Sequence, residues 1–158
     1  MRFSLKRGFS FGLASGVITT LGLMIGLDSA TASKLVVLGG VLTIAVADAL
    51  SDALGIHISV EAETKYTTRH IWESTFAAFL SKFFFALTFA VPVLLLNLKI
   101  AVFVSVIWGL FLISVFSFYL AKKQKIPAYR VIFEHLFIAV IVIFASFFVG
   151  KFVALYFV

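Results

Sequence analysis

The sequence lacks cysteine, and its charged residues are scarce. The missing cysteines exclude disulfide bonds and thiolate metal sites. Only 13% of the 158 residues are Asp, Glu, Lys or Arg, which is about half the share found in a soluble domain. The remainder is mostly apolar, since 63% of the residues are hydrophobic and the mean hydropathy is +1.17. This composition predicts an integral membrane protein with little room for a soluble domain.

Five segments are apolar enough to cross a bilayer, because a membrane helix needs about 20 mostly apolar residues. The predicted spans are Gly8–Leu27, Leu35–Ile56, Phe76–Asn97, Ile100–Ala121 and Val131–Gly150. An open sheet would leave backbone groups without hydrogen bonds in lipid, so the predicted fold class is all-α. Residues 1–158 are expected to form a single five-helix transmembrane domain. Basic residues before the first apolar run are typical of a signal peptide, but a whole bundle follows, so we interpret this run as a retained first span.

The segments between the spans are predicted to be linkers, namely Asp28–Lys34, Ile58–Thr75, Leu98–Lys99 and Lys122–Arg130. The helix of the second span is expected to continue towards Glu63. Pro127 precedes the fifth span and suits a helix start, whereas Pro92 predicts a kink in the third span.

Lys and Arg predict the orientation, since cytoplasmic loops carry an excess of both. With the N-terminus in the cytoplasm, nine of them lie inside: Arg2, Lys6, Arg7, Lys65, Arg69, Lys122, Lys123, Lys125 and Arg130. Lys34, Lys99 and Lys151 lie outside, and so does the C-terminus after five spans. A net charge of +6 would favour nucleic acid as the partner of a soluble protein. Here the basic residues cluster at span ends, so we predict contact with anionic membrane lipids and no nucleic-acid partner.

Two aspartates in the second span are the main candidates for a functional site. Asp48 and Asp52 are four residues apart and share one face of a helix. A carboxylate at membrane depth costs roughly 2.5–3.5 kcal/mol on insertion scales and is by default a functional-site hypothesis. A polar stripe about 80° wide joins them on this helix, formed by Asp48, Asp52, Gly55, Ser59 and Glu63, with Ser51 at its border. These hard oxygen ligands suit divalent cations or protons. The alternative is that one Asp is neutral and hydrogen-bonded to a neighbouring helix.

Other polar residues could extend such a cation path. In the first span, Ser15 and Thr19 add hydroxyl groups, while Gly8, Gly12 and Gly16 repeat every four residues and favour close helix packing.

The linker after the second span contains three acids that could collect metal cations: Glu61, Glu63 and Glu73. The alternative is an ordinary solvated linker, in which these acids pair with Lys65 and Arg69.

Lys82 is embedded in the third span, and two explanations remain open. Its side chain could snorkel to the interface, or it could pair with Asp52 or Glu134. A fixed cation beside the acids would weaken metal binding. The sequence contains no nucleophile–base pair, phosphate loop or zinc-helix motif, so we do not expect an enzyme.

Four stretches of the sequence resemble the vacuolar iron transporter family. The first span contains SGVITTLGLMIG, where the family has an acid, a Gly and a Thr-Thr pair. The second contains ADALSDALGIHISVEAE, which is similar to the family pattern Ala-Asp-Ala-Ile-Ser-Met, then Gly-Leu-Gly-Asp-Tyr-Leu-Ser and an acid. The third and fifth resemble the corresponding family spans with WESTFAAFLSKFFFALTFAVPVLLL and PAYRVIFEHLFIAVIVIFASFFVG. The resemblance covers nearly the whole chain, but the large metal-collecting domain of plant and yeast members is missing.

Members of that family are homodimers that move ferrous iron, and often manganese, out of the cytosol in exchange for protons. The resemblance therefore implies a homodimer through spans 1 and 2, no permanently bound cofactor, and Fe²⁺ or Mn²⁺ as the transported ion. By position, Asp48 matches the family Asp and Ser51 its Ser. Ser15 replaces the first-span acid, Ile56 replaces an acid, and Asp52 replaces a metal-facing Met.

The exchange of Met for Asp52 has two consequences. A twofold axis would bring four carboxylates together, and some would hold protons when no metal is bound. Metal binding would expel these protons, which gives a basis for proton exchange. A carboxylate in place of a thioether also favours harder ions such as manganese.

The predicted function is export of divalent iron or manganese from the cytosol in exchange for protons. The membrane would be the plasma membrane in a prokaryote and a vacuolar or other organellar membrane otherwise. Two alternatives remain, a cation or proton channel that uses the same acids and a non-transporting membrane scaffold or accessory protein of the same fold.

Overall fold

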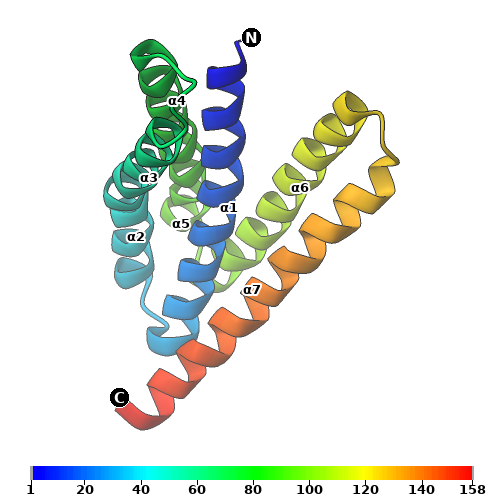
Figure 1. Cartoon of the computed structure of the whole chain (residues 1–158). Helices are drawn as coiled ribbons and strands as arrows, with labels where there is room; N and C mark the ends of the chain where they lie inside the picture. Colours follow the sequence, from blue (N-terminus) through cyan, green and yellow to red (C-terminus); the bar gives the residue numbers. More distant parts are fainter. Residues whose placement is uncertain (1, 158) are drawn as a thin grey trace. The chain divides into compact units, whose positions relative to one another are not determined.

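The structure, a computed structural model, describes residues 2–157 and is all-helical within that range (Figure 1). Five helical segments are long and apolar enough to cross a membrane: Phe3–Thr31, Lys34–Glu61, Thr68–Leu95, Leu98–Gln124 and Ala128–Phe157. These segments confirm the predicted all-α fold class. The chain has the architecture of an integral membrane protein.

Three of the segments are continuous helices: α1 (Phe3–Thr31), α6 (Leu98–Gln124) and α7 (Ala128–Phe157). The second segment consists of α2 (Lys34–Thr43), the π-helix η1 (Ile44–Asp48) and α3 (Ala49–Glu61). The third consists of α4 (Thr68–Thr88) and α5 (Ala90–Leu95).

The third segment is interrupted at Phe89, as Pro92 predicts. Proline has no N–H to donate to the carbonyl four residues earlier, which here belongs to Thr88, the last residue of α4. Pro127 also lies where the sequence predicts, directly before α7.

Several predicted boundaries are wrong because the helices extend past the apolar runs. Most of the predicted linker Ile58–Thr75 is helical, since α3 continues to Glu61 and α4 begins at Thr68. Glu61 and Glu73 therefore lie on helices. The helix of the second span continues towards Glu63, as expected, and ends at Glu61. The predicted linker Leu98–Lys99 is also wrong, because Asn97 caps α6 by accepting a hydrogen bond from the Ile100 N–H at 3.1 Å.

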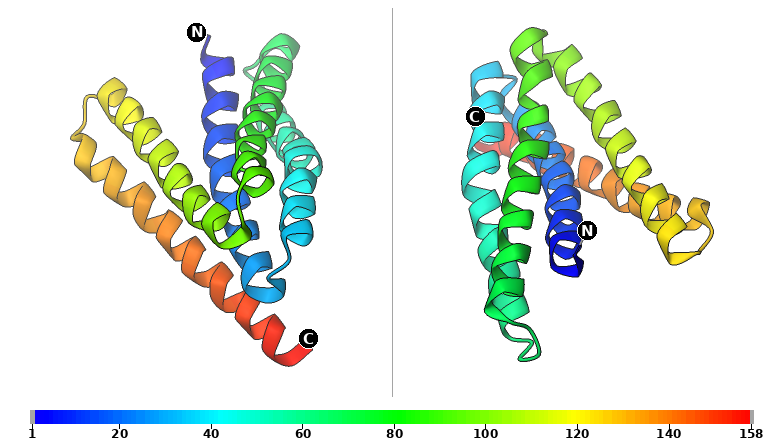
Figure 2. Two further views of the ribbon diagram at one scale, coloured as in Figure 1. Left: turned by 180° about the vertical axis from the view of Figure 1, so that it is seen from behind. Right: turned by 90° about the horizontal axis from the view of Figure 1, so that it is seen from above.

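The chain divides into two compact units. The first unit contains residues 2–20 and 41–90, and thus the N-terminal part of α1 with η1, α3 and α4. In both views of Figure 2, α3 and α4 lie beside one another. Glycines allow α1 to approach α4, because a Cβ at Gly8 would overlap the Ser74 carbonyl oxygen and one at Gly12 the Ala78 carbonyl oxygen. The predicted packing role of these glycines is confirmed.

The second unit contains residues 21–40 and 91–157. Helices α6 and α7 form an antiparallel hairpin (Figure 1), with a hydrogen bond of 2.8 Å between Ser117 Oγ and His135 Nδ1. The C-terminal part of α1 packs on α7, where the Ser29 hydroxyl donates to the Phe147 carbonyl at 3.2 Å. A Cβ at Gly150 would overlap Ser29 Oγ and the Gly26 carbonyl oxygen, so this crossing depends on glycine.

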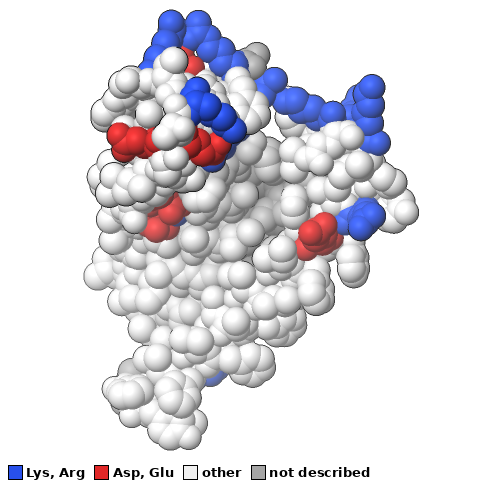
Figure 3. Space-filling model, in the orientation of Figure 1, with Lys and Arg blue, Asp and Glu red and all other residues white. Residues whose placement is uncertain are grey.

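Charged side chains gather at helix ends within each unit. In the first unit, Lys and Arg lie where α1 begins and where α3 leads into α4 (Figure 3). In the second unit they lie at the turn between α6 and α7 (Figure 3). Helices with apolar middles and basic ends are typical of proteins that span a bilayer with anionic headgroups.

Candidate functional site, a lysine between two aspartates

The embedded lysine and both second-span aspartates meet at one point of the first unit. Lys82 Nζ lies 2.5 Å from Asp48 Oδ2 and 2.5 Å from Asp52 Oδ2. Lys82 comes from α4, whereas Asp48 ends η1 and Asp52 lies in the first turn of α3. One ammonium group is thus held between two carboxylate groups on the neighbouring segment.

Burial of this cluster is uneven. The Lys82 side chain is 0% exposed, while Asp48 and Asp52 are 36% and 21% exposed. Lys82 therefore does not snorkel to an interface, and that explanation is wrong. The exposed edge of the cluster is formed by the carboxylates, so a cation from outside the unit would meet them first. Pairing with Asp52 is one of the alternatives that the sequence left open, whereas the contact with Asp48 was not among them.

Helix α1 contributes the fourth group of the cluster. The Ser15 hydroxyl donates to Asp52 Oδ2 at 2.5 Å and accepts from Lys82 Nζ at 3.0 Å. The neighbouring Gly16 makes this approach feasible, since an added Cβ would lie 3.1 Å from the Lys82 carbonyl oxygen and 3.2 Å from Lys82 Cγ. The small residues of α1 thus bring a polar oxygen to the buried charges.

A π-helix immediately precedes the cluster and ends at Asp48. Its C-cap residue, Ala49, donates to the carbonyls of Ile44 and Val46, so the wide turn passes directly into α3. Single-turn π-helices within α-helices are frequent at functional sites. No residue type in this stretch marks the wide turn, and sequence reasoning missed it.

Two predicted lining residues do not join the cluster. The Thr19 hydroxyl donates to the Ser15 carbonyl one turn earlier, at 2.8 Å, so its hydrogen is used inside α1. Ser51 is exposed on α3. The prediction for Ser15 agrees with the geometry, but these hydroxyls do not form one continuous polar path.

The three acids of the predicted collecting cluster do not come together as one metal site among the described residues. Glu61 is exposed at the end of α3. Glu63 pairs with Arg7 at 2.8 Å and with Lys65 at 3.0 Å. The hydrogen bond from Lys65, followed by that from Arg7, holds the pKa of the Glu63 carboxyl below its usual value.

Glu73 is likewise surrounded by donors. It accepts from Arg2 at 2.5 Å, from Arg69 at 2.9 Å and from the Ser4 hydroxyl at 2.6 Å. These contacts agree with the alternative interpretation of ordinary ion pairing. Acids that are already neutralised by arginine are poor collectors of metal cations.

Asp48 and Asp52 are thus the acids around which a cation site would form. Among residues 2–157, no three His, Asp or Glu side chains lie close enough together to hold a metal. Within one chain, the cluster offers two carboxylates, one hydroxyl and the nitrogen of Lys82. The arrangement can hold one cation between two carboxylate groups, as it holds the Lys82 ammonium.

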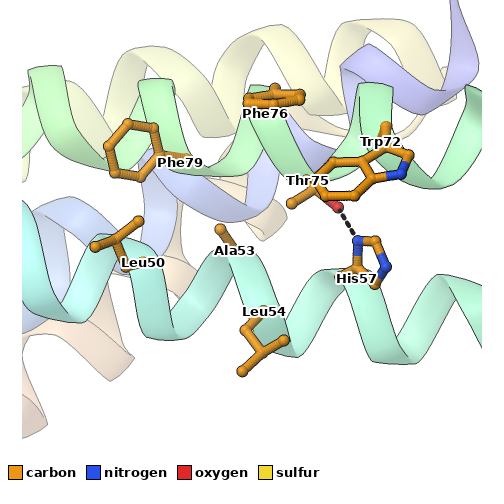
Figure 4. Close-up of a pocket in the computed structure, with 8 residues that line it drawn as sticks. All are labelled: Leu50, Ala53, Leu54, His57, Trp72, Thr75, Phe76 and Phe79. Atoms are coloured by element: carbon orange, nitrogen blue, oxygen red, sulfur yellow. Dashed lines mark hydrogen bonds between the residues drawn. The ribbon is translucent and has the colours of Figure 1, made fainter.

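A pocket between α3 and α4 lies elsewhere in the first unit (Figure 4). Its volume is about 360 Å³, and Leu50, Ala53, Leu54, His57, Trp72, Thr75, Phe76 and Phe79 line it. The polar contact there joins His57 Nδ1 and Thr75 Oγ1 at 3.0 Å. The pocket contains no carboxylate and does not extend the cation site.

Comparison of the chain with protein-family models, with curated proteins and with solved structures found no match.

Proposed function

We propose that this protein exports divalent transition metals, iron or manganese, from the cytosol in exchange for protons. The observation that carries the proposal is the position of Lys82 Nζ, which lies 2.5 Å from an oxygen of each aspartate. The ammonium group occupies the place that a transported cation would take. The carboxylates of Asp48 and Asp52 are the proposed ligands of the metal, and Ser15 supplies a further oxygen.

The ammonium and a metal ion cannot share these oxygens. Two cations at such close range repel strongly where water is scarce. With the ammonium in place, the two carboxylates and Lys82 carry a net charge of −1. A divalent ion with a neutral amine gives a net charge of zero. Binding of the metal therefore requires the ammonium to leave the carboxylates or lose its proton, and the latter releases one proton for each metal ion bound.

The donor types favour hard and borderline ions. Carboxylate and hydroxyl oxygens suit manganese and ferrous iron better than soft ions, which prefer thiolate or thioether ligands. The chain has no cysteine, and the cluster contains no methionine. The substrate class is accordingly a divalent ion with affinity for oxygen ligands.

A homodimer through spans 1 and 2 belongs to the same proposal. Gly55 lies on the same face of the second segment as Asp48 and Asp52, because the three residues fall within about 60° of one another on a helix. A Cβ added at Gly55 of α3 would meet no atom within 4 Å, so a second helix has room there. Two copies would place four carboxylates about one twofold axis, which is enough for a complete metal site.

The family proposed for the chain is the vacuolar iron transporter family, as a short form without the metal-collecting domain. The support is the order of motifs along the chain and the five apolar helices. The membrane would be a prokaryotic plasma membrane or an organellar membrane.

Metal-driven proton movement in proteoliposomes tests this function. Iron, manganese, cobalt and calcium would each be offered to the wild type, to the Asp48→Asn/Asp52→Asn variant and to Glu134→Gln. The last is the matched control, because it removes an acid from an exposed position on α7. We expect proton flux with iron or manganese that the double variant abolishes and the control retains. Absence of metal-dependent flux from folded wild type would refute the proposal.

A second candidate is a non-transporting scaffold. It is favoured by the completeness of the ion pairs, since Lys82 already contacts both acids and buries its whole side chain. In a scaffold, the lysine would neutralise the acids permanently. The same experiment separates the two, because a scaffold predicts no flux. A channel with these acids predicts cation current without proton exchange.

A further inference from the structure

Two cavities in the second unit meet at one polar mouth. The first, of about 590 Å³, is lined by Asp28, Ser29, Ala32, Asn97, Leu98, Lys99, Phe147 and Lys151. The second, of about 490 Å³, is lined by Ile25, Asp28, Lys99, Val102, Phe103, Val106, Ile143, Phe144 and Phe147. They share Asp28, Lys99 and Phe147, so they adjoin one another. Both volumes lie in the range of about 300–1,000 Å³ that is usual for small-molecule sites.

The two cavities differ in chemistry. The first contains all three charged groups, Asp28, Lys99 and Lys151. Beyond Asp28 and Lys99, the second is lined only by aliphatic and phenylalanine side chains. A ligand that fills both must have a charged end and an apolar end.

The position of the mouth matches the edge of a bilayer. It lies where α1 ends, where α6 begins and where α7 approaches its end. By the alternation of the spans, these three helix ends meet the same membrane surface. The apolar cavity follows α6 from Lys99 to Val106 and α7 from Phe147 back to Ile143, which is the direction of the membrane interior. Phosphate groups of lipids lie at the level of the mouth, and their acyl chains lie beside the cavity.

Charge decides between lipid classes. Two ammonium groups and one carboxylate give the mouth a net charge of +1. Neither Lys99 nor Lys151 forms an ion pair with a described residue, although the Lys151 ammonium lies 5.7 Å from the centre of the Phe147 ring. A single phosphodiester balances this charge. A zwitterionic headgroup leaves the mouth with its net positive charge.

We infer that this site binds one phospholipid with a single net negative charge. The phosphodiester lies between Lys99 and Lys151, and a hydroxyl of the headgroup donates to Asp28. One acyl chain occupies the cavity between α6 and α7. The inference does not depend on the proposed metal transport, because none of these residues belongs to the Lys82 cluster.

Native mass spectrometry of the full chain, released from detergent with phosphatidylglycerol or phosphatidylcholine, tests the site. We expect one phosphatidylglycerol molecule to remain bound to each chain. The fraction of chains that retain phosphatidylglycerol should exceed the fraction that retain phosphatidylcholine. The Lys99→Gln/Lys151→Gln variant should bind phosphatidylglycerol about 25-fold more weakly, the loss expected if each lysine contributes about 1 kcal/mol beside an anionic headgroup. The matched control is Lys122→Gln/Lys123→Gln, which removes the same charge from the other end of α6 and should bind as the wild type does.

A second variant tests the apolar cavity without changing charge. Val106→Trp fills the space beside α6 and should displace the lipid while both lysines remain. Glycerol phosphate, which carries the phosphate without the acyl chains, should not compete at the concentration at which the lipid binds. Equal binding of the two lipids, unchanged binding by the double-lysine variant, or full competition by glycerol phosphate would each overturn the inference.

Discussion

Replacement of Lys82 by methionine gives a direct measure of the charge cluster. Methionine is similar in length to lysine and is apolar, so packing against α1 changes little while the ammonium is lost. The variant leaves Asp48 and Asp52 without a counter-ion, although their side chains are only 36% and 21% exposed. Removing one partner of a buried ion pair costs about 3–5 kcal/mol. Because Asp48 is about one-third exposed, we expect a loss of stability near the lower limit, about 3 kcal/mol.

The informative comparison is with the triple variant Lys82→Met/Asp48→Asn/Asp52→Asn. It contains no unpaired charge, and replacing a buried ion pair by neutral groups is often neutral or stabilising. The triple variant should therefore be more stable than Lys82→Met by about 3 kcal/mol, although it contains two more substitutions. The Asp48→Asn/Asp52→Asn variant should also lose stability, because it leaves the buried ammonium without a carboxylate.

Equilibrium unfolding in mixed detergent micelles, followed by tryptophan fluorescence, measures these free energies. The coupling free energy between Lys82 and the two acids is the change in unfolding free energy of the triple variant minus the sum of the changes for Lys82→Met and for Asp48→Asn/Asp52→Asn. A stable Lys82→Met variant, or additive effects in the cycle, would refute the idea that Lys82 is held by both carboxylates.

Three further predictions concern packing, titration and substrate. Gly12→Ala should cost about 1–3 kcal/mol because its Cβ would overlap a carbonyl oxygen of α4. Gly55→Ala meets no atom within 4 Å and should stabilise the protein by up to about 1 kcal/mol, because alanine favours a helix more than glycine does. Equal effects of the two substitutions would contradict the packing of α1 on α4. The titration midpoint of Glu63, measured by NMR, should lie below the ordinary value of 4.5 and rise in Lys65→Gln. The contribution of the ion pair to stability is complete above the usual carboxyl pKa and is lost as pH falls through the lowered one. An unchanged midpoint would remove Lys65 as the main cause of the lowered pKa. Asp52→Met should shift transport from manganese towards iron, because a thioether is a softer ligand than a carboxylate, and an unchanged ratio of iron to manganese uptake would contradict direct binding by Asp52.

The membrane makes much of this fold predictable from the sequence. Runs of apolar residues must form helices in lipid, so the five spans follow from hydropathy. Their ends do not follow, because helices continue into polar sequence once the backbone leaves the hydrocarbon. The segment from Thr68 to Thr75 is polar and was expected to be a linker, yet its backbone hydrogen bonds continue the helix of α4.

The candidate site was only partly predictable. Asp48 and Asp52 are evident from the sequence because charge is costly at membrane depth. The sequence limits the possible partners of Lys82 to a few acids but does not identify the partner, since hydropathy does not reveal which helix faces lie together. A threonine within a helix commonly donates its hydroxyl hydrogen to the carbonyl oxygen one turn earlier, as Thr19 does here. This local hydrogen bond competes with a role of the hydroxyl group in lining a cation path.

The wide turn of η1 has a consequence for the helices on either side of it. An α-helix advances by about 100° per residue, so each inserted residue rotates the preceding segment by that amount relative to the following one. Deletion of one residue between Ile44 and Ala47 would restore regular α-helix and turn α2 while Asp48 and Asp52 keep their register with Lys82. The extra residue of η1 thus offsets the side chains of α2 from those that carry the acids by about 100°.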